Sequence, residues 1–278
     1  MDQAKEKSLR LHATDVRLGI IEAVYNAKSG HPGGSLSVAD ILTYLYFEEM
    51  NIDPKNPKAE DRDRFVLSKG HTSPALYSTL ANRGYFPVED LKTFRHTGSY
   101  LQGHPDMKGV PGVDMSSGSL GQGFSVACGM ALASKLSGKG FRVYTAVGDG
   151  ESQEGQIWEA AMLAAHYHLD NLVLIIDWNG LQIDGKITDV MNPTPHDEKL
   201  RAFGWNVISI DAHDFAQMET AFNAAREHKG QPTAIIAKST KGKGVSFMED
   251  QAGWHGKAPN AEQYETARAE LIALRESI

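Results

Sequence analysis

Cysteine is almost absent from this chain of 278 residues, and Cys128 is the only one. A single cysteine excludes a disulfide framework and a cysteine-based metal site. Its place in the apolar run FSVACGMALA indicates a buried structural thiol. Basic residues are outnumbered by acidic ones, and the net charge of −7 argues against a nucleic-acid partner, which would favour a basic face.

Long hydrophobic runs are also absent. No stretch approaches the ~20 apolar residues that cross a bilayer. The first residues, MDQAKEKSLRLHATD, are charged and lack the apolar core of a signal peptide, so we expect a cytoplasmic protein. Hydrophobic residues at 41% and charged residues at 23% are ordinary for a globular chain. Because repeats and linker-like stretches are missing, we expect one domain over residues 1–278.

Hydrophobic periodicity predicts two helices before the first strand. Leu9, Val16, Ile20 and Val24 recur at helical spacing within the first 28 residues. An apolar helix is expected over 38–47, after the Gly/Pro-rich break SGHPGGS. The other expected elements are strands at 64–68, 141–147, 171–177, 205–210 and 232–238, and helices at 74–83, 88–95, 154–168, 214–228 and about 261–276.

The alternation of strands and helices in the second half predicts the fold class. The strand at 171–177, NLVLIID, is apolar almost throughout, as expected for a parallel strand that is covered on both faces. The alternation indicates an α/β fold with a mainly parallel sheet and helices on both faces. Residues 97–118 are rich in Gly, Pro and Ser, and a loop of that length is often functional.

The sequence GDGE at 148–151 directly follows the strand 141–147 and precedes a helix. Glycines there let backbone N–H groups approach a ligand closely, and a helix N-terminus favours phosphate. Asp149 would repel a bare diphosphate, so we expect a divalent cation between its carboxylate and the phosphate oxygens. Asn179 ends the next strand, and parallel neighbours bring both residues to one crevice. These oxygens, with a nearby main-chain carbonyl, suit Mg²⁺.

Two competing phosphate-binding motifs fail. The dinucleotide fingerprint GxGxxG would require glycine where Gln153 stands. A P-loop pattern nearly appears from Gly180 to Lys186, but Ile187 stands where Ser or Thr is required. We also expect no helix to begin at Ile187.

The combined pattern GDGE…DWNG resembles the thiamine-diphosphate motif of the transketolase family, which opens with GDG and closes with Asn. The resemblance implies a thiamine-diphosphate-binding domain of the PP type with a motif core at 148–185. It implies thiamine diphosphate and Mg²⁺ as cofactors, with Ca²⁺ or Mn²⁺ as alternatives. Asp149, Asn179 and the main-chain carbonyl of Leu181 would bind the metal. The expected cofactor-binding residues of this motif are Gly148, Asp149, Gly150, Glu151 and Asn179.

Four histidines lie in Gly/Pro-rich or turn-like contexts, namely SGHPGGS, SKGHTSP, QGHPD and GWHGKAP. A lone loop histidine is usually solvated, but four in such contexts shift the balance, because histidine titrates near neutral pH and bonds phosphate and sugar oxygens. Each segment resembles a transketolase segment in the same chain order, so the likeness covers about residues 10–260. It implies that His71 and His255 contact the diphosphate, and that His31, His104 and His255 are catalytic residues along the sugar channel.

Three further segments carry the resemblance. SSGSLGQG at 116–123 resembles the loop beside the thiazolium ring, with Gly118 and Leu120 as cofactor contacts, although Ser119 stands where family members often have proline. Spacing alone gives Glu154 and Glu159 a solvated helix face or structural ion pairing. The resemblance implies instead a carboxylate network at a subunit interface, with Glu154 among the catalytic residues. The basic run KSTKGKG at 238–244 fits a phosphate-binding loop and a mobile surface loop equally, and the resemblance implies a segment that orders over the cofactor.

A full-length transketolase has three domains, and this chain resembles only the first. No segment matches the second domain, whose glutamate bonds the aminopyrimidine ring of the cofactor. We therefore expect a heteromer of two such chains with two C-terminal transketolase subunits. The implied reaction transfers a two-carbon ketol unit from a ketose to an aldose, with sugars or sugar phosphates as substrates.

Two alternatives remain at this point. One is another thiamine-diphosphate enzyme component, of the deoxyxylulose-phosphate synthase or 2-oxo-acid dehydrogenase type. The other is a non-catalytic, cofactor-binding homologue. The four histidine contexts favour transketolase over the first alternative, and the retention of Asp149, Asn179 and the histidines together argues against the second.

Overall fold

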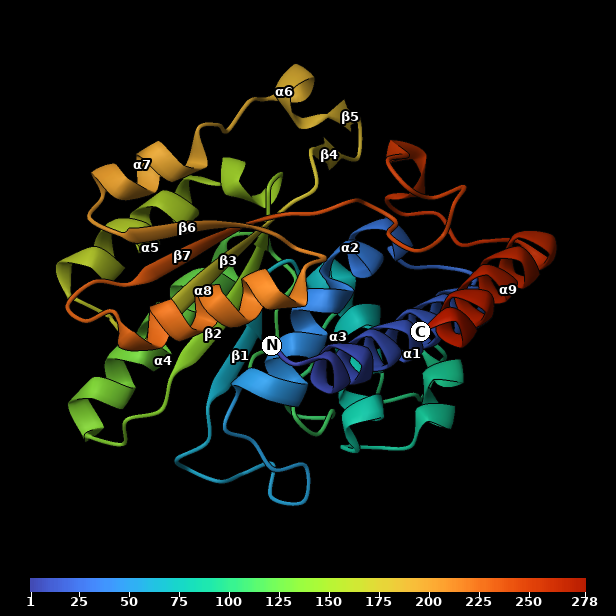
Figure 1. The fold of residues 1–278 in the computed structure, drawn as a ribbon, viewed down its shortest axis with the longest axis horizontal. Helices are drawn as coiled ribbons and strands as arrows, with labels where there is room; N and C mark the ends of the chain where they lie inside the picture. The colour runs from blue at the N-terminus through green and yellow to red at the C-terminus, as the bar shows by residue number, and fades with distance from the viewer.

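A five-stranded parallel sheet forms the centre of the computed structural model, which describes all residues 1–278 (Figure 1). Its strands are β1 (Arg64–Leu67), β2 (Val143–Gly148), β3 (Leu172–Trp178), β6 (Asn206–Asp211) and β7 (Thr233–Lys238). Their order across the sheet is β1-β2-β3-β7-β6, and every neighbouring pair is parallel. The predicted α/β class is confirmed. The first and last residues of each predicted strand lie within two residues of those of an observed strand.

Two layers of helices cover the sheet. One core cluster joins the sheet to α1 (Gln3–Ala27), α2 (Pro32–Tyr44), α3 (Ser73–Arg83) and α8 (Phe215–Glu227). The other joins it to α4 (Gln122–Ser137), α5 (Gly155–His166) and α7 (His196–Ala202). Successive strand residues point to opposite faces, so Ile175 belongs to the first cluster and Leu174 and Ile176 to the second. Coverage on both faces explains the continuous apolar character of this strand.

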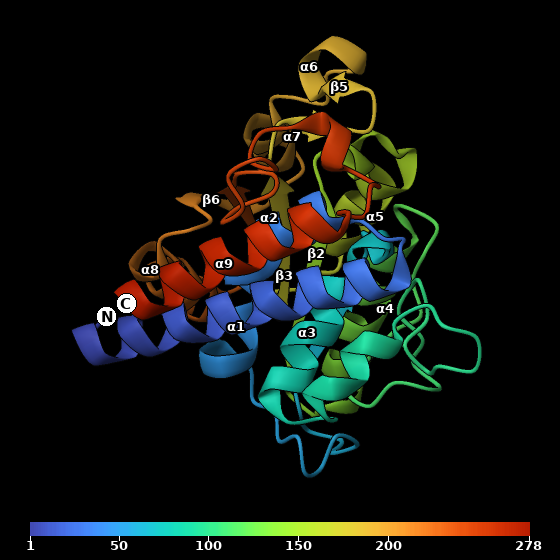
Figure 2. The ribbon, with the colours of Figure 1, turned by 90° about the vertical axis from the view of Figure 1, so that its right-hand side faces the viewer.

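The two ends of the chain lie together. Figure 2 shows α9 (Ala261–Ser277) running alongside α1, with the N- and C-termini as neighbours. Tyr25 of α1 stacks on Tyr264 of α9 at 4.0 Å between ring centroids, and Arg275 donates to Asp15 at 2.7 Å. The periodic residues that predicted α1 are buried against the core, namely Leu9, Val16, Ile20 and Val24.

Several helices differ from the predictions. The second begins at Pro32 instead of 38, because proline suits the first helical turn, and it continues as a π-helix over Leu45–Glu49. The expected helix at 88–95 is the 3₁₀-helix η3 (Val88–Thr93). Helix α4 was not predicted, although Cys128 within it is buried as expected, and burial raises the pKa of this thiol to about 12.

The expectation that no helix begins at Ile187 is wrong. The short helix α6 (Ile187–Val190) begins there, after a hairpin of β4 (Leu181–Gln182) and β5 (Gly185–Lys186). The hairpin follows β3, and Figure 1 shows it standing with α6 above the sheet. Gly185 and Lys186 of the near-match lie in this hairpin and not in a loop between a sheet strand and a helix. A P-loop is therefore still excluded.

The long loop between η3 and α4 contains no helix or strand from residue 94 to residue 121. Asp114 holds it to the sheet, because its carboxylate accepts from the Phe65 backbone N–H at 2.8 Å and pairs with Arg62. The remaining short helices are η2 (Gly70–Thr72), η4 (Glu151–Gln153) and η5 (Ala252–Trp254). None of the helices is long and apolar enough to cross a membrane.

Candidate active site

A pocket of about 380 Å³ opens at the carboxyl ends of β2 and β3. Open parallel sheets bind their ligands at this end. The predicted site residues in its lining come from five separate segments, and they are His71, Gly118, Leu120, Gly148, Asp149, Gly150, Glu151, Glu154, Asn179, Leu181 and His255. The other two predicted residues, His31 and His104, are not in this lining, but they lie against residues that are.

Asp149 joins the ends of the two central strands. It follows β2 directly, and its carboxylate oxygens accept from the backbone N–H of Gly150 at 2.8 Å and of Gly180, after β3, at 2.6 Å. Only 2% of the residue is exposed. Burial, together with the nearby charge of Asp177, raises the pKa of Asp149 to about 6. A neighbouring cation would relieve the cost of ionising this buried carboxylate.

Asn179 and Leu181 supply the other oxygens of the proposed metal set. Asn179 follows β3, and its side-chain oxygen accepts from the Leu181 N–H at 3.2 Å. The Leu181 carbonyl accepts from the Lys241 ammonium at 3.1 Å, so this carbonyl already faces a positive charge. No group of three His, Cys, Asp or Glu side chains could hold a metal ion. One carboxylate, one amide and one carbonyl are hard oxygen donors that fit Mg²⁺ when a ligand completes its shell.

Glu151 is engaged within the chain. One carboxylate oxygen accepts from the Gly121 N–H at 2.8 Å and from the Ser68 hydroxyl, and the other accepts from the Gly148 N–H at 3.0 Å. The residue is 2% exposed. Glu151 thereby ties the ends of β1 and β2 to the start of α4 and shapes the wall of the pocket.

Three histidines form a cluster beside the pocket. The ring centroids of His31 and His71 are 5.1 Å apart, and each lies 5.4 Å from that of His255. Burial and nearby positive charge lower the pKa of His31 to about 4 and that of His255 to about 3, and they hold that of His71 well below 6.5. All three rings are therefore neutral at pH 7, and each can donate one hydrogen bond and accept another.

His104 lies on the loop at 94–121, next to Gly118. A Cβ added at Gly118 would lie 3.6 Å from the His104 ring. Arg95 joins this loop to the one that carries His31, since it donates to the Ser29 hydroxyl at 2.7 Å and to the Gly103 carbonyl at 3.4 Å. Burial and the charge of Arg95 lower the pKa of His104. Arg95 was not predicted from the sequence, because nothing in the residues around it indicates its left-handed φ of 60°.

Two buried lysines were also missed. Lys69 pairs with Asp177 and donates to the Gly34 carbonyl at 3.1 Å, and the two side chains are 2% and 0% exposed. Lys241 belongs to the basic run at 238–244 but is 2% exposed and lines the pocket, so at this residue the surface-loop alternative is wrong. Burial lowers the pKa of Lys241 to about 8. The signal for Lys69 was its place two residues before His71.

The fold and this pocket define a class of protein. A parallel sheet with an Asp–Asn pair at the ends of adjacent strands, flanked by buried lysines and neutral histidines, is suited to a phosphorylated cofactor. Residues 9–273 match the family model described as "Transketolase, thiamine diphosphate binding domain". The chain therefore belongs to the transketolase family.

Relatives of two sizes match the chain. It is 46% identical over 263 residues to the 6-deoxy-6-sulfo-D-fructose transketolase subunit SqwG of Clostridium sp. (strain MSTE9), covering 95% of this chain and 96% of the relative. It is 44% identical over 265 residues to an apulose-4-phosphate transketolase subunit of Phocaeicola vulgatus, covering 95% and 94%. Human transketolase is 42% identical over 257 residues, and the match covers 92% of this chain but 41% of that relative.

Solved structures agree with this division. The transketolase of Campylobacter jejuni superposes with a TM-score of 0.89 at 36% identity, covering 95% of this chain and 42% of that chain. The transketolase of Leishmania mexicana gives a TM-score of 0.87 at 31% identity, covering 97% and 44%. The chain thus spans less than half the length of these transketolases.

Proposed function

We propose that this chain is the diphosphate-binding subunit of a transketolase that is built from two kinds of polypeptide. The observation that best supports this proposal is the share of each relative that the chain matches. It matches nearly the full length of relatives that are named as transketolase subunits, but only about two fifths of the human transketolase. Residues 1–278 act as a single domain with its motif core at 148–185, and the protein functions in the cytoplasm.

The pocket holds thiamine diphosphate and Mg²⁺. The metal would bind to Asp149, Asn179 and the Leu181 carbonyl, which together offer the hard oxygen ligands that Mg²⁺ prefers. The raised pKa of the buried Asp149 supports this assignment, because a neighbouring cation would stabilise its ionised form.

The remaining lining residues hold the cofactor. His71, His255, Gly148 and Gly150 face the diphosphate, while Gly118 and Leu120 contact the thiazolium ring. Glu151 supports this wall from behind through its bonds to the backbone. When bound, thiamine diphosphate supplies the nucleophilic carbon that breaks and forms the sugar C–C bond.

The chain's own histidines bind the sugar and move its protons. The Lys241 ammonium has no lone pair and can only donate, so its 3.0 Å contact with His255 Nδ1 is a hydrogen bond donated to that nitrogen. The His255 proton therefore lies on Nε2. This Nε2–H is available to a sugar or phosphate oxygen. His31 and His104 act beside it on the sugar hydroxyls as neutral donors and acceptors. Arg95 fixes the distance between their two loops.

A partner subunit completes the site. Ile183 lines the pocket and is 65% exposed, so the pocket is open on the side of the hairpin. The partner carries the pyrimidine-binding and C-terminal domains, in an assembly of two chains of each kind. Glu154 is exposed at the start of α5 and Glu159 follows on the same helix, and both join a carboxylate network across the interface. The substrates are sugars or sugar phosphates.

The test is reconstitution. This chain and its candidate partner are purified separately and together, and ketol transfer is measured with thiamine diphosphate and Mg²⁺ over a panel of ketoses and aldoses. We expect activity in the mixture only, and its loss with Asp149→Ala. Full activity of this chain alone would contradict the two-chain proposal, because the group that bonds the aminopyrimidine ring would then have to lie within it.

A further inference from the structure

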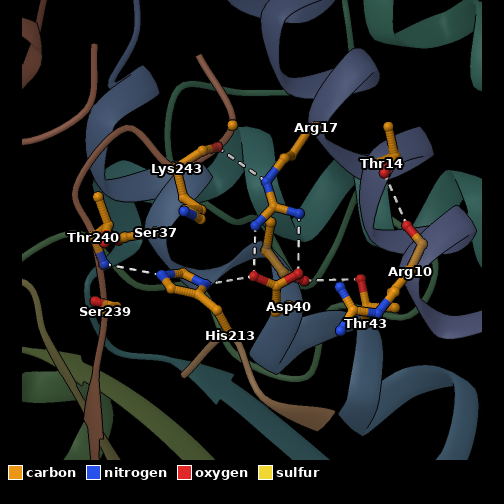
Figure 3. Close-up of polar contacts among 12 residues, drawn as sticks. Arg10, Thr14, Arg17, Ser37, Asp40, Thr43, His213, Ser239, Thr240 and Lys243 are labelled. Atoms are coloured by element: carbon orange, nitrogen blue, oxygen red, sulfur yellow. Dashed lines mark hydrogen bonds and ion pairs between the residues drawn. The ribbon is translucent and has the colours of Figure 1, made fainter. Parts of the chain in front are cut away.

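A buried ionic network joins α1, α2 and the segment after β6 (Figure 3). Arg17 of α1 donates to both carboxylate oxygens of Asp40 on α2, at 2.9 and 2.5 Å. Asp40 also contacts His213 Nδ1 at 2.6 Å. The Arg17 and Asp40 side chains are 5% and 7% exposed. Removing two charges from water is costly, so a buried pair by itself adds little stability, and its geometry calls for another explanation.

The outer groups of the network bond to the backbone of a loop that enters the cofactor pocket. His213 Nε2 accepts from the Thr240 N–H at 2.9 Å, and Arg17 Nε donates to the Lys243 carbonyl at 3.0 Å. Only an unprotonated Nε2 can accept, so the imidazole proton is on Nδ1 and is donated to Asp40. Figure 3 shows both contacts reaching the loop from one side.

Lys241 lies between these two anchored residues. Its ammonium is 3.1 Å from the Leu181 carbonyl and 3.0 Å from His255 Nδ1. The next residue is held as well, because the Gly242 N–H donates to the Gly33 carbonyl at 2.9 Å. Burial of an ammonium costs its hydration, and the flexible lysine stem could reach water if the backbone were free. Anchors on both sides prevent that movement.

We propose that Arg17, Asp40 and His213 form a positioning clamp, which holds the loop at 239–244 so that Lys241 points into the cofactor pocket. The clamp residues touch neither the pocket nor a reacting atom, so they act through Lys241. The ion pair fixes the imidazole, the imidazole fixes Thr240, and the guanidinium fixes Lys243. The effect on cofactor binding rests on the proposed function, whereas the effect on the loop does not.

Two substitutions at one position separate the parts of the clamp. In His213→Asn, the side-chain amide overlaps the Nδ1 half of the imidazole, so the bond to Asp40 is kept and the acceptor for Thr240 is lost. In His213→Gln, the longer side chain places its oxygen near the former Nε2, so an acceptor for Thr240 is restored. Both variants keep the buried Arg17–Asp40 pair, which protects the fold.

The first measurement is amide hydrogen exchange in the chain without cofactor. We expect faster exchange at 239–245 in His213→Asn, near wild-type exchange in His213→Gln, and no change in the central strands of either variant. Equal exchange of the loop in wild type and in His213→Asn would overturn the clamp. This readout is independent of what the pocket binds.

The second measurement is calorimetric titration with thiamine diphosphate and Mg²⁺ in the reconstituted complex. We expect about tenfold weaker binding for His213→Asn, which corresponds to roughly 1.4 kcal/mol, and near wild-type binding for His213→Gln. In a Lys241→Met background, His213→Asn should cause no further loss of affinity, because the effects of substitutions at coupled residues are not additive. An equal loss in both backgrounds would show that His213 does not act through Lys241. If the wild-type complex binds no thiamine diphosphate, the proposed function fails and hydrogen exchange alone decides the clamp.

Discussion

At the residue scale, some site residues could be predicted from a local sequence motif, whereas others are brought to the site only by the fold. Asp149 and Asn179 could be predicted because each ends a strongly apolar strand, and adjacent parallel strands place their ends together. Lys241 could not be, because nothing in a basic, glycine-rich run distinguishes a buried lysine from a solvated one. Arg95 was missed for a similar reason, since both of its contacts are to loops and one of them, Ser29, is remote in sequence.

The neutral histidine cluster makes a prediction about pH. The folded-state pKa values of His31 and His255, about 4 and about 3, lie below the value of 6.5 for a free histidine. Between those values the unfolded chain binds protons that the folded chain does not, so these residues lower the stability as pH falls from 6.5 towards 4, and they add no such loss above 6.5. Histidine NMR titration of the cofactor-free chain should show both rings neutral at pH 6.

Arg95→Gln provides the control for this titration. Burial is the main cause of the low pKa of His31, and the charge of Arg95 is the second. The pKa of His31 should therefore rise in the variant but stay below 6.5, while that of His255 should hardly change, because its positive neighbour is Lys241. Titration of His31 near 6.5 in the wild-type chain would contradict the buried cluster.

Gly118→Ala tests whether this glycine leaves space for the cofactor. A Cβ at Gly118 would have only ordinary contacts, the closest at 3.6 Å from the His104 ring. The variant should fold with an unchanged unfolding temperature, yet bind thiamine diphosphate about tenfold more weakly if the ring approaches this backbone, a loss of roughly 1.4 kcal/mol. Thermal unfolding checks the expected stability, and calorimetry checks the expected loss of affinity. An unchanged affinity would show that Gly118 does not contact the cofactor.

At the element scale, strands were easier to predict than helices. β3 is buried on both faces, so its residues Leu172–Ile176 form an unbroken apolar run. In α4 the buried residues include glycine, alanine and cysteine, while Met130 and Leu132 are apolar but partly exposed, so no apolar face stands out from the sequence. The residues Val88–Thr93 form a 3₁₀-helix, and periodicity does not separate so short a helix from an α-helix.

Two glycines of α4 should respond in opposite ways to alanine. A Cβ at Gly123 would lie 2.6 Å from Ser68 Cα, so the helix would have to move away from the end of β1. We expect Gly123→Ala to destabilise the chain by about 1–3 kcal/mol through overpacking. Gly129 is exposed with nothing within 4 Å of the added Cβ, so Gly129→Ala should stabilise by up to about 1 kcal/mol through helix propensity. Urea unfolding of both variants gives the comparison.

A destabilised Gly129→Ala would show that this face of α4 is packed in solution. A neutral Gly123→Ala would show that the contact between α4 and Ser68 relaxes without cost. Since both substitutions add one methyl group to the same helix, the difference between them isolates packing from propensity.

At the scale of the whole molecule, the core is packed on both faces of the sheet, whereas the pocket is open on one side. The two core clusters pack both faces of the sheet, and α9 closes against α1, so the fold does not need a second polypeptide to bury its strands. The pocket, in contrast, is bounded on one side by the exposed hairpin that carries Ile183. The proposed partner was expected from the sequence because no segment resembles the second transketolase domain, but the surface that would meet this partner could not be predicted.

Ile183→Glu therefore provides the last prediction. Because Ile183 is 65% exposed, the substitution should leave the unfolding temperature of the isolated chain unchanged. In the heteromer it would bury a carboxylate beside the pocket, so association with the partner should weaken by at least about tenfold, or roughly 1.4 kcal/mol. Leu136→Glu is the matched control: Leu136 is 80% exposed and lies near the far end of α4, about 20 Å from the pocket end at 1.5 Å per residue. Analytical ultracentrifugation of each variant with the partner measures association, and equal weakening by both substitutions would show that the hairpin is not part of the contact.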